Sequence, residues 1–415
     1  MKGQPKAVYL LNFVSMWERF SFHGLRGLLV LYMTQALGFG DRSAFVIYAA
    51  FVAISKLGGI AGGFLADKYL GLKKTLEIGV WILLSGHIVL YFAENETLFF
   101  AALGLIVMGT ALFISNIAAL VGLLYPKGDA RIESGYTLYY TGINVGSFFS
   151  AVLCGVMVHL YGWHAGFGVA SFGMLSGAIA LKYCGRMLPE SPRNRGSFQL
   201  LGGIPWKQAA KYMGLIMLFY GCEEQLGSTI VLFTERFVDR QTFIGQIPTA
   251  SLGAINPLTI MIGGPFVTAF LARVPISEST KIKGSFLLLS LSFMTLAISS
   301  FFPEKEIPVA FVMMAIMLIG MSELLFGPAI FSGISRLSPE GRAGSAMGLV
   351  PFGFFLANFF AGAYSQTMVA EQESLLLVYR TGFFVMALGT LAVVGVYSVL
   401  RKNTDRKAPA GVKGV

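Results

Sequence analysis

The feature that most constrains the fold is a series of about twelve apolar segments of roughly 20 to 30 residues, spread along the 415-residue chain. A helix of about 20 apolar residues crosses a hydrocarbon core of about 30 Å. Charged residues make up only 13% of the chain, against about 25% in a soluble domain. The segments lack the alternating pattern of barrel strands. An all-α polytopic membrane protein with 12 transmembrane helices is therefore predicted.

A connection rich in Pro, Gly, Ser and Arg separates the spans into two sets of six. The expected spans lie near residues 7–37, 43–67, 74–93, 97–125, 133–160, 164–187, 208–237, 248–272, 284–302, 307–333, 343–369 and 376–400. We expect an N-terminal six-helix bundle (1–187), a cytoplasmic linker (188–206), a C-terminal six-helix bundle (207–400) and a basic cytoplasmic tail (401–415).

The basic residues are distributed unevenly between the two sides of the predicted membrane. Most of the 31 lysines and arginines fall in connections on the side of the N-terminus, which is the positive-inside pattern. Both termini are therefore expected in the cytoplasm, with the multi-pass chain in the cell (inner) membrane. The positive-inside distribution of a chain in the lipid bilayer accounts for the net charge of +10, so no nucleic-acid partner is expected. The basic residues expected outside are Arg42, Arg236, Arg240, Lys305 and Arg380.

The two halves resemble each other weakly. Gly62-Gly63 and Gly263-Gly264 both lie late in the second span of their half, and Glu18 and Glu223 lie midway along the first. Two related halves are typical of alternating-access carriers with a substrate site near mid-bilayer. We expect the chain to work as a monomer.

Seven charged residues fall inside predicted spans, where each costs at least about 2.5 to 3.5 kcal/mol to insert. They are Glu18, Arg19, Arg26, Lys56, Glu223, Glu224 and Glu323. At about 1.5 Å of rise per residue, Glu18, Lys56, Glu223 and Glu323 share a depth of roughly 16 to 20 Å. Such a cluster either locks helices together or forms a translocation site. The shared depth favours the site.

Pairing can neutralise all but one carboxylate, since four acids face three bases. We expect Lys56 to lie beside an acid, most simply Glu18. His23 lies on one helical stripe with Arg19 and Arg26, which disfavour a charged imidazole, so the glutamates rank above it as proton carriers. Asn144 and Asn256, taken singly, fit interhelical hydrogen bonding as well as ligand binding.

The sequence offers no catalytic motif. No HExxH, nucleophile elbow or P-loop occurs. Cys154, Cys184 and Cys222 are scattered without paired spacing and are interpreted as small apolar fillers. The chain is not expected to be an enzyme or to need a cofactor or metal.

The stretch "WERFSFHGLR" resembles the first-helix signature of the proton-dependent oligopeptide transporter family of the major facilitator superfamily. Further stretches resemble family patterns in the same order: "GGFLADKYLG", "YYTGINVGSFFSAVLCG", "FYGCEEQLGST", "IPTASLGAINPLTIMIGGP" and "MSELLFGPAIFSGISRLSP". The resemblance implies the major facilitator fold and proton-driven transport of di- and tripeptides, or peptide-like molecules, by rocking of two halves.

The resemblance also implies roles for particular residues. The proton-coupling positions are Glu18, Arg19, Glu223 and Glu224. The substrate-binding positions are Arg26, Lys56, His23, Asn144, Tyr220, Asn256 and Glu323. A peptide zwitterion needs a cation for its carboxylate and an acid for its amine, and Arg26 and Glu323 fit these needs.

The chain departs from the family pattern at several positions. Ser15 replaces a first-helix glutamate and Ile114 a fourth-helix lysine, which in the family are thought to form an acid–base couple. Lys56 and His23 stand where tyrosines are usual, and Val350 where a tryptophan is usual. Any proton coupling is therefore expected to run through the seventh- and tenth-helix acids. The alternatives are an uncoupled facilitator or exporter of another small amphoteric solute, and a non-transporting substrate sensor.

Overall fold

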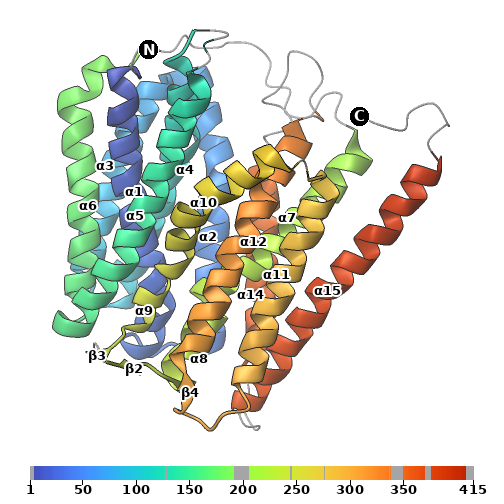
Figure 1. The fold of residues 1–415 in the computed structure, drawn as a ribbon. Coiled ribbons are helices and arrows are strands. Elements are labelled where there is room, and N and C mark those ends of the chain that lie inside the picture. The colour runs from blue at the N-terminus through green and yellow to red at the C-terminus, as the bar shows by residue number, and fades with distance from the viewer. Residues whose placement is uncertain are drawn as a thin grey trace.

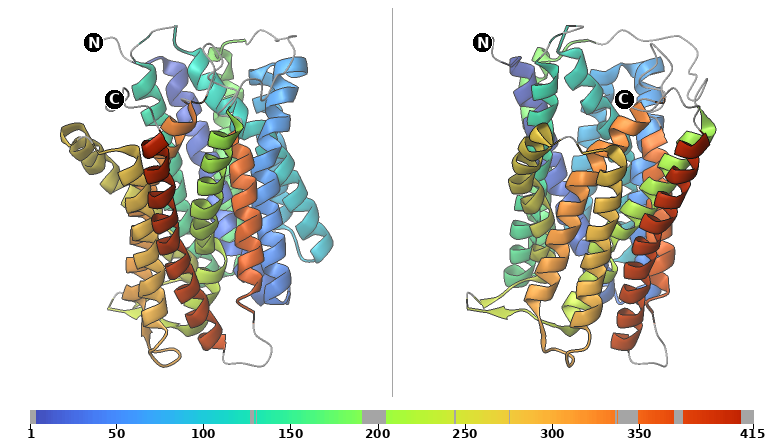
Figure 2. Two further views of the ribbon diagram at one scale, coloured as in Figure 1. Left: turned by 90° about the vertical axis from the view of Figure 1, so that its right-hand side faces the viewer. Right: turned by 45° about the vertical axis from the view of Figure 1, so that its right-hand side comes forward.

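The computed structural model describes residues 4–126, 129, 131–190, 205–243, 245–274, 276–335, 337, 349–369 and 375–407. Its long helices run roughly side by side and form one bundle (Figures 1 and 2). The first half contains α1 (Lys6–Gln35), α2 (Asp41–Leu65) with the π turn η1 (Ala66–Leu70), α3 (Leu72–Tyr91), α4 (Glu96–Leu123), α5 (Ile132–Tyr161) and α6 (Trp163–Cys184) with the 3₁₀ turn η2 (Gly185–Met187).

The second half contains more broken helices. Its elements are α7 (Trp206–Glu223), the 3₁₀ turn η3 (Glu224–Gly227), α8 (Thr229–Phe237), α9 (Thr249–Leu252), α10 (Ile255–Arg273), α11 (Glu278–Ser299), α12 (Val309–Ser335), α14 (Leu349–Gln366) and α15 (Leu375–Lys407). Four two-residue strands lie in its connections: β1 (Val238–Asp239) pairs in parallel with β4 (Ile307–Pro308), and β2 (Gln241–Thr242) pairs antiparallel with β3 (Gly245–Gln246).

Nine helices among the described residues are long and apolar enough to cross a membrane. They are Asp41–Leu70, Leu72–Tyr91, Glu96–Leu123, Gly135–Tyr161, Trp163–Met187, Thr249–Val267, Glu278–Ser299, Val309–Phe331 and Leu375–Val399. Three other expected spans coincide with α1, with the α7–η3–α8 segment and with α14. Helix α1 carries Glu18, Arg19 and Arg26 in its interior, and it packs against α5 and α6.

Several expected boundaries differ from the structure. The expected span 208–237 is interrupted by the 3₁₀ turn at Glu224–Gly227, and the expected span 248–272 divides into α9 and α10. Helix α15 continues beyond residue 400 to Lys407. Most of the expected linker, and the expected tail beyond Lys407, lie outside the described residues.

The weak similarity between the halves corresponds to a repeated packing contact. Gly62 of α2 lies against the backbone of Ala111 in α4, so closely that a Cβ atom would overlap it. Gly263 of α10 lies against Leu324 of α12, where a Cβ atom would come within 2.8 Å of the leucine side chain. In both halves, a glycine late in the second expected span lets it approach the fourth closely, as small residues do between membrane helices.

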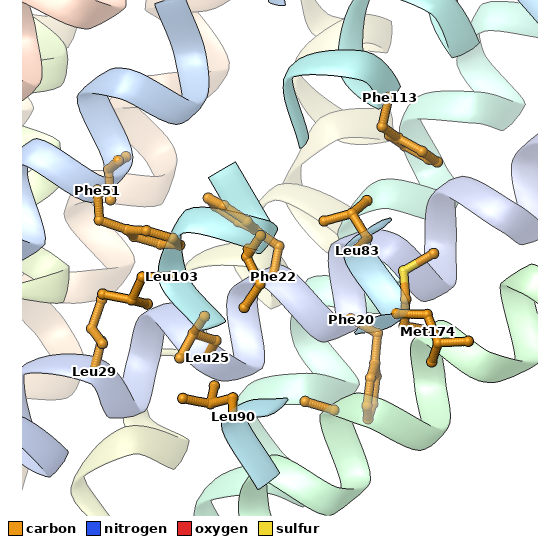
Figure 3. Packing of buried hydrophobic residues seen from close by; sticks show 14 of the residues in the cluster. Phe20, Phe22, Leu25, Leu29, Phe51, Leu83, Leu90, Leu103, Phe113 and Met174 are labelled. Atoms are coloured by element: carbon orange, nitrogen blue, oxygen red, sulfur yellow. The ribbon is translucent and has the colours of Figure 1, made fainter. Parts of the chain in front are cut away.

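Each half has an apolar core, and Val231, Leu232 and Ala250 of the second half join the core of the first. In the first half, Phe22 and Leu25 of α1 meet Phe51 of α2 and side chains of α3 and α4 (Figure 3). The halves meet where α2 packs on α14 and where α5 packs on α9 and α10. The seam between the two cores is therefore the place where polar groups can gather.

The two ends of the bundle differ. Helix α1 starts and helix α15 ends at one end, here named the terminal end (Figure 1). The strands β1–β4 lie at the opposite end, here named the hairpin end. If the terminal end is cytoplasmic, as the basic residues predict, the hairpin end faces outward.

Candidate functional site

An arginine of the first half bridges to acids of the second half. The Arg26 Nη2 atom lies 2.7 Å from Glu224 Oε2 and 3.9 Å from Glu223 Oε1. Its Nε donates a hydrogen bond to the Tyr48 hydroxyl at 2.7 Å, and Tyr48 donates to Glu224 Oε2 at 3.3 Å. Glu224 therefore accepts bonds from both α1 and α2 across the seam.

The break in the expected span positions Glu224 for this bridge. Helix α7 ends at Glu223, and Glu224 begins the 3₁₀ turn η3. Gln225 fixes the turn to α14, since its Nε2 donates to the Ala361 carbonyl at 3.3 Å and its Oε1 accepts from Ser365 at 3.0 Å. Gly227 lies directly against the Tyr48 hydroxyl, where any Cβ atom would overlap it.

Glu18 and Arg19 form a buried ion pair with each other. Arg19 Nε lies 2.5 Å from Glu18 Oε2, and Arg19 Nη2 lies 2.6 Å from Glu18 Oε1. Both residues are buried, and the guanidinium also lies 5.1 Å from the Phe22 ring centroid. This bidentate geometry uses both carboxylate oxygens.

Lys56 is expected to lie beside an acid, most simply Glu18, but the structure shows no ion pair between Lys56 and Glu18 within 4.0 Å. Lys56 forms no ion pair within 4.0 Å with any acid in the described part of the chain. Its Nζ atom lies 5.5 Å from the centroid of the Phe354 ring, on α14 of the other half. The physical reason is that Arg19 occupies Glu18 at both oxygens. Lys56 still interacts electrostatically with Glu224 and Glu18, and is repelled by Arg19 and Arg26.

A second group of polar residues surrounds Glu323 on α12. The Asn256 amide of α10 has a buried Nδ2 atom and lies close enough to the Glu323 carboxylate to interact with it. Tyr140 of α5 and Tyr220 of α7 are near enough to interact with Glu323. The Tyr220 ring packs against the Phe354 ring, with 4.5 Å between the two ring centroids. Glu323 is partly exposed and, among the described residues, has no cation within 4.0 Å.

The remaining predicted residues differ in their access to a ligand. His23 is half-buried and lies among Arg19, Arg26 and Lys56. Asn144 is buried and donates from Nδ2 to the Tyr140 carbonyl of its own helix at 3.0 Å. That bond lies within α5 and is not interhelical, so the roles of Asn144 in helix packing and in ligand binding both stay predictions.

The two replaced family positions carry no charge in the structure. Ser15 is buried, and its hydroxyl has no partner among the described residues. Ile114 packs against α2, where its Cγ2 lies 2.9 Å from the position a Cβ atom on Gly59 would take. The structure therefore puts no acid–base pair at these positions.

Sequence reasoning missed several contributors. Tyr48 and Phe354 carry no signal in a sequence, because aromatic residues are common in membrane spans. A second cross-half ion pair joins Asp41 at the start of α2 to Arg236 at the end of α8, with bonds of 2.5 and 2.7 Å. The sequence places Arg236 among the basic residues expected outside, but nothing in it relates Arg236 to Asp41, because the two lie far apart along the chain.

The observed polar contacts between the halves all lie toward one end of the bundle. They join Arg26 and Tyr48 to Glu224, Asp41 to Arg236, and Ser251 to the Val152 carbonyl. All of these residues lie between mid-bundle and the hairpin end, given the direction in which each helix runs. No group of three metal-binding side chains occurs in the described part of the chain.

The fold and the site define a polytopic membrane transporter, in which two helical halves enclose charged, partly exposed side chains. The model of the POT family matches residues 73–199 and 207–384, and the chain belongs to this family.

Named relatives agree with this assignment. Peptide transporter YePEPT of Yersinia enterocolitica subsp. palearctica is 26% identical over 459 residues, which cover 90% of each chain. Dipeptide and tripeptide permease B of Yersinia enterocolitica is 25% identical, over 96% of this chain and 94% of the permease. A crystal structure of peptide transporter POT in complex with sulfate has the same fold, with a TM-score of 0.87 over 97% of this chain and 95% of that one, at 21% identity.

Proposed function

We propose that this POT-family protein is a secondary transporter, not an enzyme, that carries di- and tripeptides or peptide-like molecules together with protons by alternating access. The names of the relatives support the substrate class. The observation that carries the mechanism is the bridge from Arg26 and Tyr48 to Glu224, because it joins the halves through a group that can be protonated.

Protonation of Glu224 would weaken the closed hairpin end. A neutral carboxyl loses its charge attraction for Arg26, and a charge-assisted bond is roughly twice as strong as a neutral one. Glu223, 3.9 Å from the same guanidinium, lies beside Glu224 on the second half, so it is a second acid on the far side of the seam from Arg26. Separation of the halves at the hairpin end takes Arg26 away from both glutamates, and a neutral Glu224 lowers the electrostatic cost of that step.

Glu323 and Asn256 suit the amino-terminal end of a peptide. A carboxylate with no cation within 4.0 Å among the described residues, next to the buried amide of Asn256, suits an ammonium group and a peptide carbonyl. Protons, peptides and the bilayer are thus the proposed partners of a monomer in the cell (inner) membrane, with both termini cytoplasmic and 12 spans.

Reconstitution tests this proposal. Uptake of radiolabelled L-alanyl-L-alanine into proteoliposomes should rise with an inward proton gradient. Glu224→Gln should remove that stimulation while dialanine exchange continues. The control Glu96→Gln changes an exposed acid at the start of α4 and should behave as wild type.

The uncoupled alternative is favoured by one observation, the absence of an acid–base pair at Ser15 and Ile114. Wild-type uptake that ignores the gradient would support a facilitator. Binding of dialanine without uptake or exchange would support a sensor.

A further inference from the structure

The cations of the site are not equally free to meet a ligand. Arg19 places two nitrogen atoms on the two oxygens of Glu18. Arg26 directs Nε to Tyr48 and Nη2 to Glu224, with Glu223 as a further neighbour. A ligand carboxylate at either arginine would have to compete with an acid that is already in place.

Lys56 is in a different situation. It forms neither an ion pair nor a hydrogen bond with any other described residue, and it is partly exposed. Its ammonium lies 5.5 Å from the centroid of the Phe354 ring, which is a weak contact compared with a carboxylate. A charged lysine in the membrane interior normally faces a partner or a watery cavity, and here the partner is missing.

The packing of α2 on α4 shows which side chains stand one helical turn from Lys56. Gly59, three residues after Lys56 and hence about one helical turn away, lies against Ile114 and Ser115 of α4. The neighbouring wall is therefore apolar at Ile114, and α2 supplies the positive charge. The nearest acids act on Lys56 only at longer range, and Arg19 and Arg26 repel it.

The opposite charge is provided by the other half. Glu323 on α12 and Asn256 on α10 form a polar group without a cation within 4.0 Å among the described residues. Arg26 and Lys56 both lie close enough to Glu323 to attract it electrostatically. Of these two, Lys56 has no acid of its own.

We propose that Lys56, and not Arg26, binds the carboxylate of the ligand, whose amine meets Glu323 and Asn256 on the other half. This inference rests on the proposed function and specifies its ligands as zwitterions with a free carboxylate. Arg26 is then a residue of the bridge between the halves. A zwitterion bound in this way would connect α2 to α12 across the seam.

The test compares two ligands that differ only at the carboxylate. Equilibrium binding of L-alanyl-L-alanine and of L-alanyl-L-alaninamide is measured by calorimetry on the purified full chain. Wild type should bind the amide about tenfold or more weakly, as expected for a lost charged hydrogen bond. Lys56→Met should bind dialanine as weakly as the amide, so that the ratio of the two affinities falls to about one.

Matched variants complete the test. Lys68→Met removes an exposed lysine from the π turn that extends the same helix, and it should keep the wild-type ratio. Lys56→Arg should keep part of the ratio, because it retains the charge. Lys56→Met is expected to fold, since it removes an unpaired charge from the membrane interior, and Lys56→Gln provides a second neutral variant.

Two outcomes would overturn the inference in different ways. A wild-type ratio that survives in both Lys56→Met and Lys56→Gln would return carboxylate binding to Arg26 and leave the proposed function standing. Failure of wild type to bind dialanine at all would overturn the proposed function, and with it the role of Lys56.

Discussion

At the scale of single residues, the seam depends on a glycine as much as on charges. Gly227 leaves space for the Tyr48 hydroxyl, which accepts from Arg26 and donates to Glu224. A larger residue would move that hydroxyl away from both partners. The geometry of the bridge thus has a steric condition that charge counting does not reveal.

Gly227→Ala should therefore destabilise the protein and weaken transport. Overpacking of this kind costs about 1 to 3 kcal/mol, so thermal unfolding in detergent should shift down by several degrees, and dialanine uptake should fall. Gly214→Ala on α7, where a Cβ atom meets nothing within 4 Å, should leave the unfolding temperature unchanged or raise it. Equal unfolding temperatures for Gly227→Ala and wild type would show that Tyr48 adjusts freely.

Residue identities in the site were largely predictable, whereas their partners were not. Glu18, Arg26 and Glu323 stand out in the sequence because charges are rare inside membrane spans. The choice between Arg19 and Lys56 as the partner of Glu18 depends on the reach of side chains, which a sequence does not display. Tyr48 was missed because a hydroxyl on an aromatic ring is ordinary in such a helix.

At the scale of elements, the hairpin end is held by an ion pair between helix ends. Asp41 begins α2 and Arg236 lies in the last turn of α8, and two hydrogen bonds join them. Near them, Thr249 of α9 donates to Glu235, which also pairs with Arg240 at 3.2 Å. The ends of α2, α8 and α9 are thereby connected where the halves meet.

Asp41→Asn should open the hairpin end more often. Spin labels are placed at Glu94→Cys and Glu304→Cys, which replace exposed acids on loops of opposite halves, in a Cys184→Ser background. Double electron–electron resonance then measures the distance between the two labels. Removing the ion pair would destabilise the closed hairpin end by up to about 1 kcal/mol. The population of molecules with widely separated labels would then rise by up to about fivefold. The charge swap Asp41→Arg with Arg236→Asp should restore the short distance. An unchanged distribution in Asp41→Asn would mean that the pair does not hold the halves.

Element positions followed from composition, and their interruptions did not. The nine described helices that could cross a membrane were predictable because about 20 apolar residues define each of them locally. The 3₁₀ turn at Glu224–Gly227 depends instead on Gln225 reaching α14, a contact between residues more than 130 positions apart. Tertiary contacts of this kind decide where a membrane helix breaks.

At the scale of the whole molecule, the observed polar contacts between the halves lie from mid-bundle to the hairpin end. The basic residues of the sequence predict that this end faces outward. If this end does face outward, the structure is closed toward the outside. The orientation can be checked with the protein's own thiols.

Cys184 is exposed at the end of α6, whereas Cys154 and Cys222 are buried. An impermeant maleimide should therefore leave the wild-type protein unlabelled in spheroplasts and label it in inverted vesicles. Glu304→Cys in a Cys184→Ser background should give the opposite pattern. Labelling of Cys184 in intact spheroplasts would reverse the predicted topology.

The bridge between Arg26 and Glu224 also bears on whether the carrier changes conformation when no peptide is bound. Pulling the two apart without a proton or a ligand leaves lone charges in the membrane interior, at a cost of several kcal/mol. An empty, ionised carrier would thus rarely cycle under the proposed mechanism. A cell could keep many copies in its membrane during starvation without slowly draining the gradient that powers its other pumps.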